Sequence, residues 1–284
     1  MLARYVNFVK LPHTVFALPF AFLGVVYASF QYPVGVTKLV LVLVAFTAVR
    51  FAAMGFNRIV DRETDALNPR TRGRELPTGA LSVRQAAISV ALASAVFVVA
   101  AGLLNRVCLM LSVPALLWVL GYSYSKRFTS WSHLWLGGAL AVAPIGGYLA
   151  VAGRWSTPAW PLLAVAAGVT LWVAGFDMFY ALQDERFDRE QGLRSAVVLL
   201  GKQRSIVLAK SLHGITLAIL VIFGVGAGFG VWYYIGIAVG AGILTWEHRL
   251  VKHDDLSRVG AAFFAFNGIM SLVVLTGALL DRVL

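Results

Sequence analysis

Two sets of polar residues at helical spacing, starting 120 positions apart at Asn57 and Asp177, are the residues of this chain best suited to chemistry. Steps of four or seven residues return an α-helix to nearly the same face. We therefore expect each set to form one stripe of oxygen ligands along a helix, at the end of a long apolar run. The two sets are Asn57, Asp61 and Asp65, and Asp177, Asp184 and Asp188.

Oxygen ligands in apolar surroundings suit a hard cation. Carboxylates there are costly unless cations neutralise them. Mg²⁺ prefers oxygen ligands and is commonly bound together with substrate phosphates. A solvated helix end would explain one stripe, but two matching stripes favour a paired site. The sequence therefore predicts a Mg²⁺ site, with Asp61, Asp65, Asp184 and Asp188 as its catalytic carboxylates.

Arginine-rich segments follow both stripes, at 67–79 and 188–195. Proline and glycine in these segments end the helices. Arginine presents a planar fork of donors that fits phosphate oxygens. We therefore expect a phosphate-containing substrate to be bound at this end of the helices.

The elements that position these residues are expected to be membrane-spanning helices. The chain is 60% hydrophobic and 13% charged, whereas about a quarter of the residues of a soluble domain are charged. Apolar runs of about 17–25 residues, long enough to cross a bilayer, recur along the whole length. We expect an all-α integral membrane protein with a single domain over residues 1–284. Its nine transmembrane helices are predicted at 12–30, 37–58, 83–104, 107–124, 132–152, 160–182, 205–225, 229–248 and 261–280.

The net charge of +11 is distributed unevenly between the two sides of the expected bundle. Lysine and arginine concentrate before the first helix and after the even-numbered helices, and by the positive-inside rule these segments are cytoplasmic. We therefore expect a multi-pass protein of the cell membrane with its N-terminus and both stripes at the cytoplasmic side and its C-terminus outside. The excess of basic residues therefore indicates the orientation of the protein in the membrane, and we expect no nucleic-acid partner. The opposite loops carry only Lys38, Arg106, Arg154 and Arg282.

Charged and aromatic residues also occur deeper in the apolar helices. Arg50 lies seven residues before Asn57, two turns deeper on the same face. A charged side chain within a membrane helix indicates function, with a structural ion pair as the alternative. The segment from Tyr122 to Arg127 could equally be an aromatic belt with cations that reach the membrane surface.

The two stripes, read as Asn-x-x-x-Asp-x-x-x-Asp and Asp-x-x-Tyr-x-x-x-Asp-x-x-x-Asp, resemble the UbiA superfamily of intramembrane prenyltransferases. The resemblance covers essentially the whole chain. The segment 11–20 resembles the branch of 4-hydroxybenzoate polyprenyltransferase-like enzymes. Further matching residues are the runs 68–71 and 74–79, with Tyr122, Lys126 and Arg127.

This resemblance implies nine helices around a central cavity, with a cytoplasmic polar cap. It implies an enzyme that transfers a polyprenyl group from polyprenyl diphosphate to an aromatic acid, with 4-hydroxybenzoate as the expected acceptor, in ubiquinone or menaquinone biosynthesis. Mg²⁺ would be held by Asn57, Asp61, Asp65, Asp177, Asp184 and Asp188. The diphosphate would be bound by Arg72, Lys126, Arg127 and Arg194.

We further expect Tyr180 to stabilise an allylic cation through its ring, and Arg50 to hold the carboxylate of the acceptor. The expected partners are the two substrates and the lipid bilayer, without an obligate protein partner.

Three alternatives stay open. The same chemistry could act on a naphthoate acceptor of the futalosine route to menaquinone. A membrane transporter would place charged or broken segments near the bilayer midplane, often in inverted repeats, whereas these carboxylates lie at helix ends on one side. A purely structural role explains neither stripe.

Overall fold

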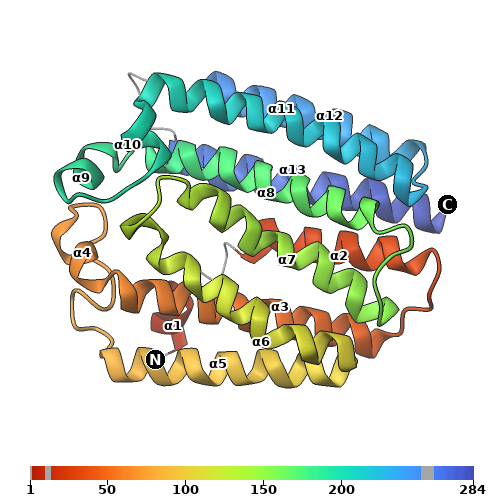
Figure 1. The fold of residues 1–284 in the computed structure, drawn as a ribbon, viewed down its shortest axis with the longest axis horizontal. Helices are drawn as coiled ribbons and strands as arrows, with labels where there is room; N and C mark the ends of the chain where they lie inside the picture. Colours follow the sequence, from red (N-terminus) through yellow and green to blue (C-terminus); the bar gives the residue numbers. More distant parts are fainter. Residues whose placement is uncertain (1, 10–13, 251–258) are drawn as a thin grey trace.

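In a computed structural model the described residues are 2–9, 14–250 and 259–284. They form helices and connecting loops (Figure 1). The helices are α1 Leu2–Phe8, α2 Thr14–Ser29, α3 Val36–Val60, α4 Arg62–Leu67, α5 Val83–Leu104, α6 Arg106–Gly121, the 3₁₀ helix η2 Tyr122–Arg127, α7 Ser132–Ala152, α8 Trp160–Ala181, α9 Glu185–Glu190, α10 Ala196–Leu200, α11 Lys202–Ala227, α12 Val231–Leu250 and α13 Val259–Val283.

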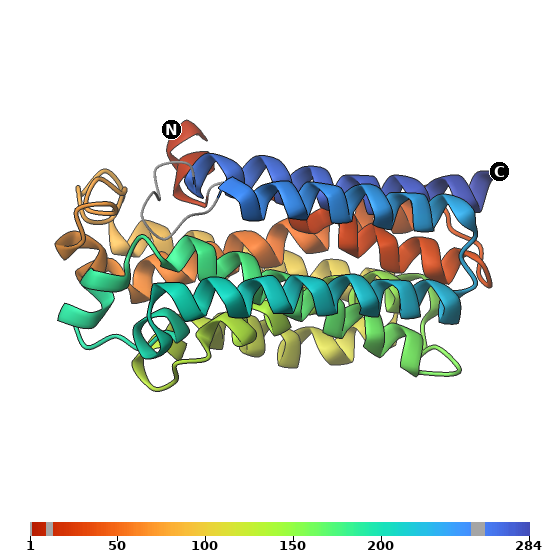
Figure 2. The ribbon, with the colours of Figure 1, turned by 90° about the horizontal axis from the view of Figure 1, so that it is seen from above.

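The long helices run side by side, as Figures 1 and 2 show, and the short helices α4, α9 and α10 gather at one end. α1 lies toward that same end, whereas α13 finishes at the opposite end. Seven spans in the described residues are long and apolar enough to cross a membrane, and the apolar part of α2, Ala17–Ser29, is shorter. The prediction of an all-α membrane protein is confirmed, and the count of nine crossings stays a prediction.

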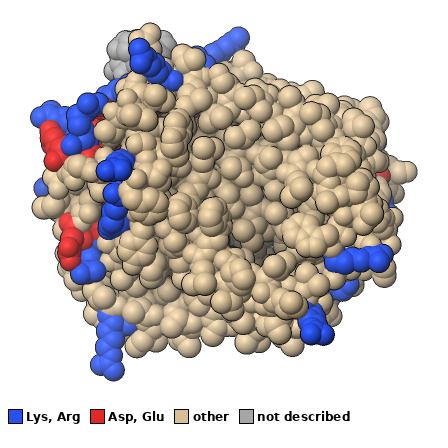
Figure 3. Space-filling model, viewed as in Figure 1, with Lys and Arg blue, Asp and Glu red and all other residues tan. Residues whose placement is uncertain are grey.

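Charged side chains lie mainly at the two ends of the molecule. On the face drawn in Figure 3, lysine, arginine and acidic atoms gather at the end that carries α4 and α9, with fewer at the other end. A broad band without charged atoms separates them. This distribution suits a bundle whose middle faces hydrocarbon, because charged side chains at the bilayer centre are costly.

Close backbone contacts fix α7 between two neighbouring helices. A Cβ atom on Gly147 would lie 1.9 Å from the carbonyl oxygen of Ala21 in α2, and one on Gly137 would lie 2.1 Å from that of Thr170 in α8. Small residues allow membrane helices to approach this closely. α8, which carries Asp177, is therefore held firmly against α7.

Both stripes are interrupted where the bundle ends. α3 stops at Val60, and Asp61 (φ −95°, ψ 6°) separates it from α4. Asp184 (φ −102°, ψ 2°) likewise precedes α9. The prediction that each stripe follows one continuous helix is therefore wrong, because the chain leaves the helical conformation at the middle aspartate of each stripe.

The four-residue spacing nevertheless survives both interruptions. The backbone N–H of Asp65 donates to the carbonyl oxygen of Asp61 over 2.7 Å, and that of Asp188 donates to the carbonyl oxygen of Asp184 over 2.8 Å. Each aspartate pair thus stays one turn apart, in two local structures of the same kind.

Candidate active site

The ends of α3, α4, α8 and α9 enclose a small cavity of about 160 Å³, here called the polar chamber. All six oxygen ligands predicted from the sequence line it, although they come from segments far apart in the chain. Cationic and imidazole side chains complete the wall. The charged and polar lining residues include Asn57, Asp61, Asp65, Asp177, Asp184 and Asp188 together with Arg70, Arg74, Lys126, Arg127 and His133.

Each carboxylate of the two aspartate pairs contacts a different cation. Asn57 also donates from Nδ2 to Asp61 over 2.8 Å. The charges of these two pairs are therefore largely balanced, because each of the four carboxylates has its own counter-ion. The ion pairs are Arg127–Asp61 at 3.2 Å, Arg74–Asp65 at 2.7 Å, Lys126–Asp188 at 2.9 Å, and Arg70–Asp184.

Arg70 links the loop after α4 to α8 and α9. Its Nε donates to Asp184 Oδ1 over 2.9 Å, its Nη2 donates to Oδ2, and its Nη1 donates to the Tyr180 hydroxyl over 2.6 Å. Asn68 adds a bond from Nδ2 to Asp184 Oδ1 over 3.1 Å. Burial acts to raise the pKa of Asp184, but the hydrogen bonds and charge of Arg70 outweigh it and hold that pKa below its usual value.

Asp61, the equivalent aspartate of the first pair, has its pKa shifted in the opposite direction. Burial raises the pKa of the Asp61 carboxyl above its usual value, and the charge of Arg127 only partly offsets this. The nearby Asp65 carboxylate raises that pKa further. Asp61 is thus the less well neutralised of the two middle aspartates, and the one that gains more from an added cation.

Not every predicted phosphate contact lines the polar chamber. Arg72 is exposed and lies outside its wall, while Arg70 and Arg74 take the inward positions. Arg194 donates from its side chain to the Phe128 carbonyl over 2.9 Å, so it supports the loop after η2. The inward positions of Arg70 and Arg74 could not be predicted from the sequence, because the direction of side chains in an irregular loop has no fixed period.

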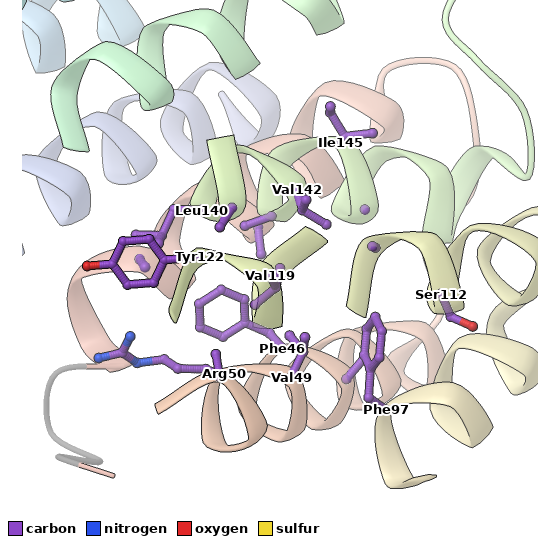
Figure 4. Close-up of a pocket in the computed structure, with 18 of the residues that line it drawn as sticks. Phe46, Val49, Arg50, Phe97, Ser112, Val119, Tyr122, Leu140, Val142 and Ile145 are labelled. Atoms are coloured by element: carbon purple, nitrogen blue, oxygen red, sulfur yellow. The ribbon is translucent and has the colours of Figure 1, made fainter. Parts of the chain in front are cut away.

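A larger cavity of about 520 Å³, here called the apolar cavity, lies between α2, α3, α5, α6, α7 and α8. Figure 4 shows Phe46, Phe97 and aliphatic side chains along it, with Arg50 and Tyr122 near one end. The two cavities share part of their walls, so they adjoin each other. The shared residues are Asn57, Arg74, Tyr122, Asp177 and Tyr180.

Asp177 has a partner that the sequence analysis did not identify. His133, near the start of α7, contacts it through Nδ1···Oδ2 at 2.6 Å. The imidazole is fully buried. A lone histidine in an apolar segment carries no spacing signal that would connect it to an aspartate 44 positions away.

The donor chemistry of the polar chamber fits Mg²⁺, which takes carboxylate and amide oxygens. In the described residues, however, no three acidic, histidine or cysteine side chains converge closely enough to hold a metal ion. The carboxylates are turned instead toward their arginine and lysine partners. Metal binding would therefore require these carboxylates to leave their cations.

Comparison with known proteins identifies similar chains of this architecture. The model of the UbiA prenyltransferase family matches residues 17–269. A 4-hydroxybenzoate octaprenyltransferase of Pseudomonas aeruginosa is 30% identical over 247 residues, which cover 87% of this chain and 82% of the relative. The apo structure of a UbiA homolog from Aeropyrum pernix K1 has a TM-score of 0.86 and 32% identity, and the match covers 95% of this chain and 98% of that one. A UbiA homolog from Archaeoglobus fulgidus bound to GPP and Mg²⁺ has a TM-score of 0.66 at 19% identity, covering 95% and 99%.

Proposed function

Because the chain belongs to the UbiA prenyltransferase family, we propose that it transfers a polyprenyl group from polyprenyl diphosphate to an aromatic acid, with 4-hydroxybenzoate as the preferred acceptor. The observation that carries this proposal is the junction of the polar chamber with the apolar cavity. One end of a polyprenyl diphosphate is highly charged and the other is hydrocarbon, so the substrate would span the two spaces. The relative from Pseudomonas aeruginosa supports the choice of acceptor.

Oxygen ligands of the polar chamber would hold Mg²⁺, which supplies charge neutralisation at the diphosphate oxygens. The Mg²⁺ and GPP in the Archaeoglobus fulgidus homolog support this assignment. The proposed ligands are Asn57, Asp61, Asp65, Asp184 and Asp188. Asp177, the sixth ligand predicted from the sequence, lies at the chamber's inner edge and also lines the apolar cavity.

The cations that pair with these carboxylates would then bind the diphosphate. Arg70, Arg74, Lys126 and Arg127 already lie in the chamber wall. If a carboxylate were to hold the metal, its former cationic partner would have a free donor for a phosphate oxygen. The exchange keeps every buried charge paired and avoids the cost of an isolated one.

The reaction itself would take place at the junction of the two spaces. The bond between the allylic carbon and the diphosphate oxygen breaks, and its electron pair leaves with the diphosphate. The apolar cavity excludes water from the resulting cation, and the ring of Tyr180 offers its face to positive charge, as it already does to Arg70 at 4.8 Å. The acceptor ring forms the new carbon–carbon bond and then loses a proton to an aspartate of the polar chamber or to the released diphosphate.

Arg50 is the proposed anchor of the acceptor carboxylate. It lines the apolar cavity but not the polar chamber, and Figure 4 shows it toward the same end of the apolar cavity as Tyr122. A guanidinium there would hold an aromatic acid with its ring toward the junction.

We also propose that the polar chamber faces the cytoplasm, with the N-terminus on that side and the C-terminus outside. The distribution of lysine and arginine supports this orientation. The positions of α1 and the end of α13 at opposite ends of the bundle are in keeping with it (Figure 1).

The purified protein in lipid nanodiscs tests the proposal directly. A labelled polyprenyl diphosphate is offered with a panel of aromatic acids, including 4-hydroxybenzoate and a naphthoate, with Mg²⁺ or with a chelator. We expect Mg²⁺-dependent diphosphate release and a prenylated aromatic acid by mass spectrometry. A folded protein that prenylates no acid in the panel would refute the proposal, and uptake of an acid into sealed vesicles without diphosphate release would indicate a transporter.

A further inference from the structure

His133 and Asp177 form a buried pair at the junction of the polar chamber and the apolar cavity. Asp177 lines both spaces, while His133 lines only the polar chamber. The side chain of His133 is 0% exposed and that of Asp177 is 16% exposed. A carboxylate accepts hydrogen bonds, so His133 Nδ1 is the donor of the 2.6 Å contact.

Asp177 differs from the other carboxylates of the chamber in its partner. The two aspartate pairs each form ion pairs with arginine or lysine, whereas in the described residues the hydrogen-bond partner of Asp177 is an imidazole. Its bond uses Oδ2. Lys126 interacts with Asp177 electrostatically, but among the described residues no guanidinium or ammonium group forms a direct ion pair with it.

Burying His133 costs free energy, and its contact with Asp177 can explain why a histidine occupies this position despite that cost. His133 Nε2 is buried and has no hydrogen-bond partner among the described residues. A buried polar atom left unpaired costs about 1–3 kcal/mol. An apolar side chain would avoid this cost, but it would lose the single side-chain bond that His133 makes.

The backbone around the pair is held rigidly. Gly137 lies one turn after His133 in α7, and Thr170 lies about two turns before Asp177 in α8. These two residues are where α7 and α8 approach so closely that a Cβ atom on the glycine would overlap the Thr170 carbonyl. The distance between the imidazole and the carboxylate is therefore set by two helices that cannot easily shift.

We infer that His133 is a positioning residue, which fixes the Asp177 carboxylate beside the point where the allylic carbon becomes positive. This inference rests on the proposed function. As the carbon–oxygen bond breaks, its electron pair leaves with the diphosphate into the polar chamber, and positive charge develops on the allylic carbon. A negative charge held in advance at the junction stabilises that state more than the bound substrates.

This role predicts a specific kinetic change. An interaction that forms only in the transition state alters kcat and leaves KM almost unchanged. His133→Phe should therefore lower kcat by about 10–100-fold, as does the loss of other groups that orient an active-site ligand. The KM of the prenyl donor and the KM of the aromatic acid should both stay near the wild-type values.

His133→Asn provides the matched rescue. The Asn amide nitrogen takes about the place of the imidazole Nδ1, so this variant should recover most of the kcat lost in His133→Phe. Asp177→Asn should lose kcat to a similar extent. Adding His133→Phe to it should cause little further loss, because the two residues act as one unit.

A structural control separates positioning from folding. Tyr233→Phe removes another fully buried hydrogen bond, from the Tyr233 hydroxyl to the Leu220 carbonyl, away from both cavities. It should lower the unfolding temperature and leave kcat unchanged.

The inference is overturned if His133→Phe keeps wild-type kcat, if His133→Asn is as impaired as His133→Phe in a folded state, or if the losses in the double variant multiply. A wild-type protein without prenyl transfer would instead refute the proposed function, and the inference would fall with it.

Discussion

Replacing Asp184 by asparagine separates a catalytic role of this carboxylate from a structural one. Asp184 accepts hydrogen bonds from Arg70 and Asn68, and its side chain is 8% exposed. The amide keeps the shape and one acceptor oxygen but removes the negative charge. Arg70 is 30% exposed, so water can solvate it after the change. We expect the free energy of unfolding to fall by only about 1 kcal/mol.

The expected loss of activity is much larger. In the proposed mechanism Asp184 binds the metal that neutralises the leaving group, and the loss of one preorganised electrostatic group lowers kcat by about 100-fold or more. That corresponds to about 2.7 kcal/mol of transition-state stabilisation. The increase in the activation free energy should therefore be more than twice the decrease in the free energy of unfolding.

The assay measures kcat for prenyl transfer at saturating Mg²⁺ and, in parallel, denaturant unfolding in detergent. Glu190→Gln is the matched control, because it removes an exposed carboxylate that pairs with Arg186 at the same end of the bundle. This control should change neither quantity. Wild-type kcat in Asp184→Asn would refute the metal assignment, and a stability loss equal to the kinetic loss would make Asp184 a structural residue.

Three further changes test other parts of the structure. Arg70→Leu should raise the KM of the diphosphate donor about tenfold or more with little change for the acceptor, since it removes a charge-assisted contact; an unchanged donor KM in steady-state kinetics would exclude Arg70 from the diphosphate site. Arg50→Leu should raise the KM of the aromatic acid more than that of the donor, and the reverse result would remove Arg50 as its anchor. Gly147→Ala should lower the unfolding free energy by about 1–3 kcal/mol, because its Cβ would lie 1.9 Å from the Ala21 carbonyl oxygen. Gly146→Ala, with nothing within 4 Å of its Cβ, should not, and equal unfolding curves for the two would contradict the close packing of α2 and α7.

The sequence predicts the long helices well because their length is set by the bilayer. The range 83–104 coincides with α5, and 160–182 differs from α8 by one residue. Apolar runs of this kind allow few alternatives, since every backbone polar group in hydrocarbon must be bonded within the helix.

The details of the site depend on contacts that have no sequence period. A four-residue step is compatible with a continuous helix and also with the turn at Asp61, which keeps the same backbone bond. The inward positions of Arg70 and Arg74 follow from the path of one loop, which lets Arg70 reach Tyr180 and Asp184 while Arg74 turns back to Asp65 in α4. The partner of Asp177 is fixed by the packing of α7 on α8, which only the three-dimensional structure reveals.

The separation of the chain ends, with α1 toward the polar chamber and α13 finishing at the far end, has a practical consequence (Figure 2). A reporter protein fused after Leu284 would project from the end opposite the short helices α4 and α9, so it would not obstruct the diphosphate. In sealed vesicles of known sidedness, the protease sensitivity of such a reporter would show on which side of the membrane the polar chamber opens. The substrate for the assay could then be supplied from that side alone.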